Sequence, residues 1–266
     1  MKLIETGPVL LEIDDGVAHL RLNRPEASNG MDVPFLRALY DAVMITTGRP
    51  DLRAVLLTGE GPNFCAGGDV KTFASKGEAL PDYLREATAW LQNVAQGLLA
   101  LPVPVVAAVH GFAAGGGGLG LVCASDIVIA AESARFMSGA ARVGMAPDAG
   151  SSVTLPQLVG VRKAMEILLL NPILSAVEAL EIGLVTRVVA DEQLHDEASA
   201  IVRTLASGAP RALGATKRLV WSGLGNRVEA QLPEEARTVS ELSGSADARE
   251  GLAAVIERRS PRFTGR

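Results

Sequence analysis

The amino-acid sequence predicts an α/β fold, and three observations carry this prediction. Two alternating apolar runs meet at Asp15-Gly16, which is the pattern of a β-hairpin. The middle of the chain then repeats a buried apolar run, a glycine-rich loop and a helical segment, as α/β proteins do. From about residue 200 onward, helical patterns follow one another without strands. We therefore expect a core over residues 1–200 and a C-terminal helical region over residues 201–266.

The elements of the first half follow from apolar spacing and turn residues. Residues 33–48 place apolar side chains at helical spacing, and residues 52–59 form a buried strand that ends in the loop GEGPNFCAGGDV. A helix is expected to begin near Asp69. Residues 83–101 form a longer helix, which two prolines end.

The second half begins with a buried strand over residues 103–111, followed by a glycine run that leads into a helix. Residues 126–137 supply further strand. The expected helices after this point cover residues 161–170, 175–183, 191–208, 210–223 and 247–259. Ser175 and Glu178 have the spacing of a capping box, and Gly183 ends that helix.

Composition and charge exclude several classes of protein. The net charge of −5 argues against nucleic acid or an anionic membrane as a partner, because binding to phosphate requires basic patches. Residues 87–125 contain no Asp, Glu, Lys or Arg, but prolines and glycines interrupt them, so they predict a buried core segment and no membrane span. Two cysteines and no visible signal peptide favour a reducing cytoplasm. The three histidines have no metal-ligand spacing, so we expect no metal site.

The glycine run Gly115 to Gly120 matches the dinucleotide-binding pattern G-x-G-x-x-G, but four consecutive glycines satisfy it almost by accident. No acidic residue follows at the spacing that ribose binding requires. A second glycine loop, CAGGDV, also opens a predicted helix. Two such loops could each direct a main-chain N–H at one oxygen, which is the arrangement of an oxyanion hole.

A carboxylate in unusual surroundings is the other candidate for chemistry. Asp148 lies among small and apolar residues in GMAPDAGSS, where it is either a catalytic base or the N-cap of a following helix. Local sequence leaves both interpretations open. Asp69, directly after the second glycine loop, is interpreted mainly as a helix cap.

Several motifs together resemble the crotonase superfamily, the enoyl-CoA hydratases and isomerases. They are NFCAGGDV, the long segment from AAVHGFAAGGGGLG to GMAPDAGSSVTLPQLVG, and the tail RRSPRFTGR. The resemblance implies a spiral of ββα turns and C-terminal helices that build a homotrimer or hexamer. It also implies an acyl-CoA thioester as substrate, with no cofactor beyond the coenzyme A that the substrate carries.

The resemblance also assigns residues. The two donors of the oxyanion hole fall at Gly68 and Gly116. The positions implied to contact the acyl-CoA are Ala27, Ala66, Asp69, Val70 and Phe263. Phe263 matches a residue that helps to close the CoA site in related proteins, sometimes from a neighbouring subunit.

One departure from the family pattern bears on the chemistry. The two glutamates that hydratases use fall at Leu119 and Ala140, and neither side chain can activate water or donate a proton. Phenylacetate-pathway isomerases and 4-chlorobenzoyl-CoA dehalogenases of the family carry an aspartate at the position of Asp148. Dehalogenase chemistry also requires an aromatic-rich pocket, and only 4% of this chain is aromatic. We therefore expect an isomerase that moves a double bond from the 3,4 to the 2,3 position with Asp148 as its proton carrier. A catalytically silent acyl-CoA binder and an atypical hydratase remain as alternatives.

Overall fold

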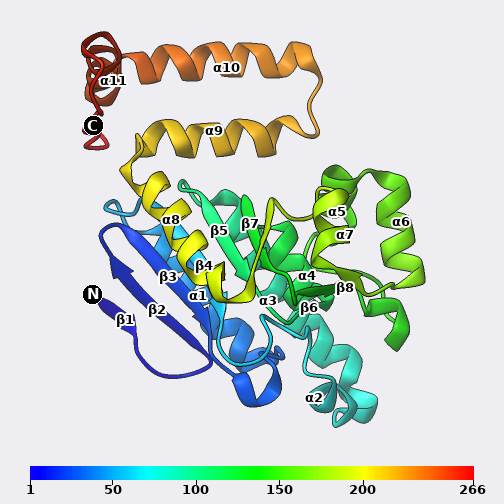
Figure 1. Ribbon diagram of the computed structural model, residues 1–266. Helices are drawn as coiled ribbons and strands as arrows, with labels where there is room; N and C mark the ends of the chain where they lie inside the picture. The colour runs from blue at the N-terminus through cyan, green and yellow to red at the C-terminus, as the bar shows by residue number, and fades with distance from the viewer.

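The computed structural model describes residues 1–266, and its main sheet has seven strands in the order β1-β2-β3-β4-β5-β7-β10 (Figure 1). The strands are β1 Lys2–Ile4, β2 Val9–Asp14, β3 Val17–Leu22, β4 Ala54–Gly59, β5 Val105–Val109, β7 Ile127–Ala131 and β10 Arg187–Val189. The first three strands pair antiparallel, and the pairs from β3 to β10 are parallel. Parallel neighbours require crossover connections, which helices provide here.

The β2–β3 hairpin confirms the turn expected at Asp15-Gly16. Asp14 pairs with Val17, so the loop has two residues. Asp15 and Gly16 have φ values of 45° and 77°, the left-handed conformations that a two-residue type I′ turn requires. The hairpin therefore forms for the local reason that its sequence indicates.

The chain enters a second, three-stranded sheet after β5, after β7 and again before β10. This second sheet contains β6 Phe112–Ala114, β8 Arg135–Met137 and β9 Leu174–Ser175, in the order β6-β8-β9. The chain thus runs from β5 to β6 to helix α4 (Gly115–Cys123), and again from β7 to β8 toward helix α5 (Ser151–Val159). These repeated ββα turns form the spiral that the crotonase resemblance implies.

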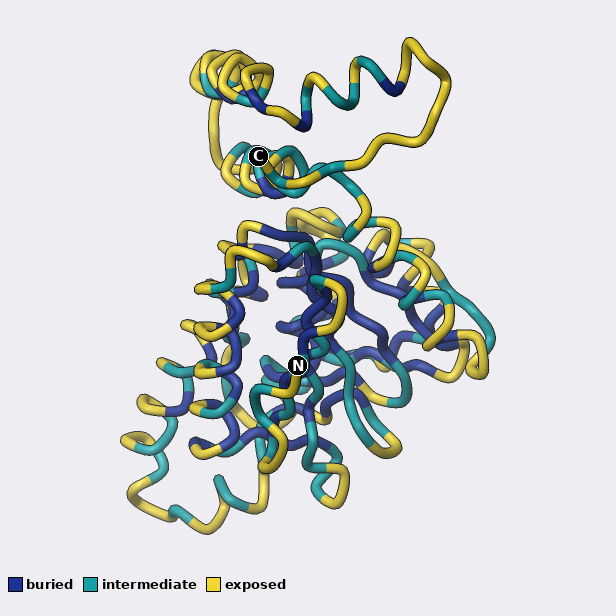
Figure 2. The backbone as a smooth tube through the Cα atoms, turned by 90° about the vertical axis from the view of Figure 1, so that its left-hand side faces the viewer, coloured by how far each residue is buried: buried dark blue, intermediate teal, exposed yellow.

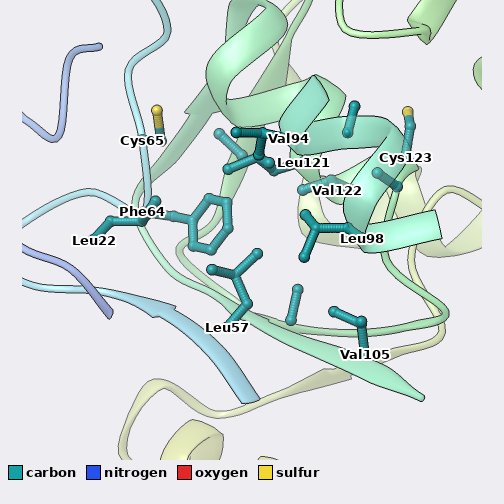
Figure 3. Packing of buried hydrophobic residues seen from close by; sticks show 14 of the residues in the cluster. Leu22, Leu57, Phe64, Cys65, Val94, Leu98, Val105, Leu121, Val122 and Cys123 are labelled. Atoms are coloured by element: carbon teal, nitrogen blue, oxygen red, sulfur yellow. The ribbon is translucent and has the colours of Figure 1, made fainter. Parts of the chain in front are cut away.

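Two layers of helices cover the main sheet. Helices α1 (Val33–Thr47) and α3 (Leu80–Ala100) pack on one face, and α8 (Leu194–Ser207) packs on the other. Figure 3 shows part of the larger hydrophobic core, in which the buried ring of Phe64 lies among strand and helix side chains. The uncharged segment 87–125 lies in α3, β5, β6 and α4, so it is core as expected. None of the helices combines the length and the apolar character that crossing a membrane needs.

The remaining elements before α8 are short. The helices are α2 Val70–Ala74, α6 Val161–Leu170 and α7 Ala176–Glu181, and the 3-10 turns are η1 Pro25–Ala27, η2 Gly77–Ala79, η3 Ala140–Val143 and η4 Asp191–Gln193. Helix α7 has the capping box predicted from its sequence, with both the Ser175 and the Glu178 side chains bonded to the main chain.

Three helices follow α8, of which the last two stand apart from the core (Figures 1 and 2), whereas the first contacts it through Lys217, which donates to the Leu98 carbonyl. They are α9 Pro210–Gly223, α10 Val228–Ser243 and α11 Ala246–Glu257. The boundary expected at residue 200 falls inside α8, which still packs on the sheet. The sequence patterns above do not predict α10, which contains Pro233, a residue that usually interrupts a helix.

Candidate active site

The two glycine loops meet because their flanking residues pair like strands. Cys65 forms an isolated parallel bridge with Ala113. The Ala114 N–H donates to the Cys65 carbonyl at 2.9 Å. These bonds hold the loop after β4 against the start of α4, so Gly68 and Gly116 line one cavity.

The close approach of the loops requires glycine. Gly67 has a φ of +100°, a conformation that side chains rarely adopt. A methyl group on Gly67 would also lie 2.9 Å from the Ala114 carbonyl oxygen and 3.3 Å from the Gly115 Cα. Any side chain at this position would therefore separate the two loops.

Two main-chain N–H groups are free to bind a ligand here. On either side of Gly68, the Gly67 carbonyl and the Asp69 N–H bond to Met31, whereas the Gly68 N–H donates to no group of the protein. Gly116 lies in the first turn of α4, where N–H groups have no acceptor within the helix. The positive end of the α4 dipole adds to this donor pair. Two free N–H groups that line one cavity could both donate to a single ligand oxygen, as an oxyanion hole requires.

The cavity beside these donors has a volume of about 590 Å³ and a mostly apolar wall. Its lining comes from three regions, namely the glycine loops, the segment 137–148, and a wall from α1, α2 and α3. The wall residues are Leu36, Val70, Phe73, Ala74, Leu80, Leu84, Ala87, Thr88 and Leu91. Only two ionisable side chains line the cavity, Asp148 and Arg142.

The Asp148 carboxylate lies directly against Gly116. A methyl group on Gly116 would overlap Oδ1 of Asp148. No other side chain bonds or forms an ion pair with this carboxylate. Burial raises the pKa of Asp148, and a hydrogen bond from its own amide only partly opposes this shift. A carboxylate without a counter-ion in an apolar cavity is a stronger base than a free aspartate.

Asp148 is not the cap of the following helix. The N-cap of α5 is Gly150, and no side chain caps that helix. The Asp148 carbonyl, not its carboxylate, accepts hydrogen bonds from the N–H and hydroxyl of Ser151, at 2.9 and 2.6 Å. The structure thus removes the N-cap alternative and leaves the carboxylate facing the cavity.

Asp69 is a helix cap, as the sequence indicated. Its Oδ1 accepts the Thr72 N–H at 3.1 Å, and its Oδ2 lies 2.9 Å from Nη2 of Arg24. Burial alone would raise the pKa of Asp69, but these partners outweigh burial and lower it. Asp69 does not line the cavity. Its contacts with Thr72 and Arg24 hold the loop that contains Gly68.

The other residues assigned by resemblance divide into two groups. Ala66 and Val70 line the cavity, and Val70 is 60% exposed at its rim. Ala27 lies outside the lining, in the η1 turn, and the neighbouring Ser28 carbonyl accepts the Ala66 N–H at 2.9 Å. Phe263 lies near Gly251 of α11, away from the cavity of its own chain. A contact between Phe263 and the substrate therefore requires a neighbouring copy, and it stays a prediction.

The positions of the two family glutamates differ in their surroundings. Ala140 lines the cavity, whereas Leu119 is fully buried on α4 and does not. No Glu side chain lines the cavity at all. Nor does the chain bring together three or more His, Cys, Asp or Glu side chains that could hold a metal ion.

Two further side chains, which the sequence patterns above did not identify, also shape the site. Arg24 joins the loops, since it bonds the Gly30 carbonyl and contacts both Asp32 and Asp69. Phe73 lies over the other donor glycine, and a methyl group on Gly68 would overlap its ring. Phe73 follows Asp69 by one helical turn, and this spacing is the one sequence signal that could have found it.

The cavity thus brings one carboxylate and two free N–H groups together in apolar surroundings. A model described as enoyl-CoA hydratase/isomerase matches residues 12–266 of the chain. The chain belongs to the enoyl-CoA hydratase/isomerase family, whose substrates are acyl-CoA thioesters.

Relatives with known names carry both activities. The chain is 40% identical over 255 residues to a protein named probable enoyl-CoA hydratase from Rhodobacter capsulatus, covering 96% of this chain and 97% of that one. It is 38% identical over 261 residues to the 1,2-epoxyphenylacetyl-CoA isomerase of Escherichia coli, covering 97% and 98%. The crystal structure of an enoyl-CoA hydratase from Bacillus anthracis superposes with a TM-score of 0.92 at 31% identity, covering 98% of this chain and all of that one.

Proposed function

We propose that this protein is an enoyl-CoA isomerase that converts a 3-enoyl-CoA into a 2-enoyl-CoA. The observation that carries the proposal is a single unpaired carboxylate, Asp148, beside two free N–H donors in a cavity with no glutamate. Hydration requires one group to activate water and another to protonate carbon. A double-bond shift needs only one group, which removes a proton and returns it elsewhere.

In the proposed reaction, the thioester oxygen accepts hydrogen bonds from the N–H groups of Gly68 and Gly116. This withdraws electron density from the carbonyl and acidifies the protons on carbon 2. The Asp148 carboxylate removes one of them, and the electron pair forms a dienolate whose oxygen the two donors hold. The Asp148 carboxyl group then gives the proton to carbon 4, which leaves the double bond between carbons 2 and 3. No cofactor enters the balance.

Two physical effects lower the barrier. One oxyanion donor is typically worth about 3–4 kcal/mol of transition-state stabilisation. The raised pKa of Asp148 reduces the difference between its pKa and that of the protons on carbon 2. Burial disfavours the charged carboxylate, so the carboxylate accepts a proton more readily. The apolar wall also limits exchange of that proton with solvent.

Names of relatives support an isomerase without deciding it. The Escherichia coli relative is named an isomerase, and so is the trans-2-decenoyl-[acyl-carrier-protein] isomerase of Streptococcus mutans, which is 30% identical. The Rhodobacter capsulatus relative is named a hydratase. Hydration through Asp148 alone is therefore the second candidate to test.

A substrate panel tests the proposal. Purified protein is incubated with 3-hexenoyl-CoA, and the absorbance of conjugated 2-hexenoyl-CoA is followed; separately, it is incubated with 2-hexenoyl-CoA, and loss of that absorbance is followed. We expect fast conversion in the first assay and little change in the second. Fast hydration of 2-hexenoyl-CoA would favour the hydratase. Tight binding of both thioesters without conversion would favour a silent acyl-CoA binder.

We also propose that the protein works as a homo-oligomer, a trimer or hexamer. Large apolar side chains are exposed on helix α6, which include Val161, Met165, Leu169 and Leu170, and on α11, which include Leu252, Val255 and Ile256. Such surfaces on one chain favour burial against other copies. Sedimentation velocity tests this, and a monomer at micromolar concentration would contradict it.

A further inference from the structure

The ring of Phe73 covers one of the two donor glycines. Phe73 lies on α2, and its Cε2 and Cζ atoms occupy the space that a Gly68 methyl group would need. The ring is held in place by Tyr83, with centroids 6.1 Å apart in an edge-on arrangement. The Tyr83 hydroxyl in turn accepts the Val33 N–H at 3.0 Å, at the start of α1. This chain of contacts fixes the ring against the glycine.

The two donor glycines are thus covered by one side chain each. Phe73 lies against Gly68 and Asp148 lies against Gly116. An acyl group whose oxygen is bound by both N–H groups has its carbons 2 and 3 beside these two side chains. Space at these carbons is therefore limited by a flat, held ring.

The wall beyond Phe73 offers nothing polar to the tail of the acyl group. Leu80, Leu84 and Leu91 form most of it. The Thr88 hydroxyl donates to the Leu84 carbonyl at 2.7 Å. The exposed Arg142 donates to the Asn171 carbonyl at 2.8 Å. A hydroxylated tail would lose its water against these leucines without gaining a partner.

We propose that Phe73 is a specificity-determining residue, which admits acyl groups that are unbranched at carbon 2 and have an apolar tail. This inference rests on the proposed binding of the thioester oxygen between Gly68 and Gly116. A methyl branch at carbon 2 meets the edge of the ring, and the edge-on contact with Tyr83 favours this position of the ring. One methyl group in an apolar pocket typically changes affinity by about 10- to 200-fold.

Two isomeric saturated thioesters test the proposal by calorimetry. Pentanoyl-CoA and 2-methylbutanoyl-CoA have the same composition and differ in the branch at carbon 2. We expect the wild-type protein to bind pentanoyl-CoA at least about tenfold more tightly. Phe73→Ala should bring the ratio close to one, whereas Phe112→Ala, which removes a ring that is 36% exposed and outside the cavity, should leave it unchanged.

The outcomes separate this inference from the proposed function. Saturated thioesters have no double bond to move, so their binding does not depend on turnover. If the wild-type protein discriminates between the isomers but does not convert 3-hexenoyl-CoA, the proposed role of Phe73 stands and the proposed isomerase activity fails. Equal binding of the two isomers by the wild type, or an unchanged ratio in Phe73→Ala, would overturn the inference. If Phe73→Ala does not fold, Phe73→Leu serves instead and should reduce the ratio partially.

Discussion

The carboxylate of Asp148 lies so close to the Cα of Gly116 that no side chain fits between them. The same glycine is proposed to donate its N–H to the thioester oxygen. The proposed base and the proposed oxyanion donor are therefore in direct contact, although 31 residues lie between them in the chain.

This contact gives the first prediction. Gly116→Ala should displace the Asp148 carboxylate, because the added methyl group would occupy the position of Oδ1. We expect kcat/KM for 3-hexenoyl-CoA to fall about 10²- to 10³-fold, the typical cost of one disturbed oxyanion donor. Gly225→Ala is the matched control, since a methyl group there meets nothing within 4 Å. Normal turnover by Gly116→Ala would show that the contact is not part of the reaction.

The pH dependence of turnover gives the second prediction. The base must be ionised, and burial raises the pKa of Asp148 above its ordinary value of 3.8. Activity should therefore be lost as the pH falls through this raised pKa, at a higher pH than an exposed aspartate would give. The measurement is kcat/KM for 3-hexenoyl-CoA against pH, over the range in which the protein stays folded. A profile that is flat down to pH 4 would contradict it.

The sequence predicts those features of the site that depend on neighbouring residues in the chain. The two glycine loops could be singled out because each follows a buried strand and opens a helix, and the crotonase resemblance then implied Gly68 and Gly116 as the donors. The role of Asp148 could not be decided, because Pro147 and the following helix are equally typical of an N-cap. The structure removes this ambiguity, because the helix begins at Ser151, its N-cap is Gly150 and no side chain caps it.

Contacts between distant segments are what the sequence could not predict. Phe73 is one aromatic residue on a five-residue helix, and nothing local indicates that its ring covers Gly68. Arg24 lies in a loop motif, but its three partners come from two different segments. The α/β alternation, in contrast, was predictable because apolar periodicity is a local property of each element.

Stability gives the third prediction. The raised pKa of Asp148 means that the folded protein binds its proton more tightly than the unfolded chain does. Above the folded-state pKa the carboxylate is charged in both states, and its burial destabilises the fold. Asp148→Asn should therefore raise Tm at pH 7, and this gain should shrink as the pH falls toward 3.8. The exposed Asp41→Asn serves as the control in calorimetry, and a lower Tm for Asp148→Asn at pH 7 would contradict the account.

A buried ion pair gives the fourth prediction. Nζ of Lys217, on α9, lies 2.8 Å from Oδ2 of Asp126 and donates to the Leu98 carbonyl at 2.7 Å. Lys217→Ala would leave the Asp126 charge buried without its partner, so we expect a loss of about 3–5 kcal/mol in the free energy of unfolding. Urea denaturation measures this.

The control for this variant is Lys163→Ala, which removes the exposed pair with Glu166 and should cost about 0–1 kcal/mol. Equal losses for the two lysine variants would show that the buried pair does not hold the C-terminal helices to the core.

The central claim is that one carboxyl group carries the proton, and the Asp148→Asn variant tests it most directly. Turnover of 3-hexenoyl-CoA and binding of hexanoyl-CoA are measured on the same preparation, with Asp41→Asn alongside. We expect kcat to fall at least about 10²- to 10⁴-fold, the usual contribution of a general base, while Kd for hexanoyl-CoA changes little. Conversion of 3-hexenoyl-CoA by Asp148→Asn at the wild-type rate would contradict the account.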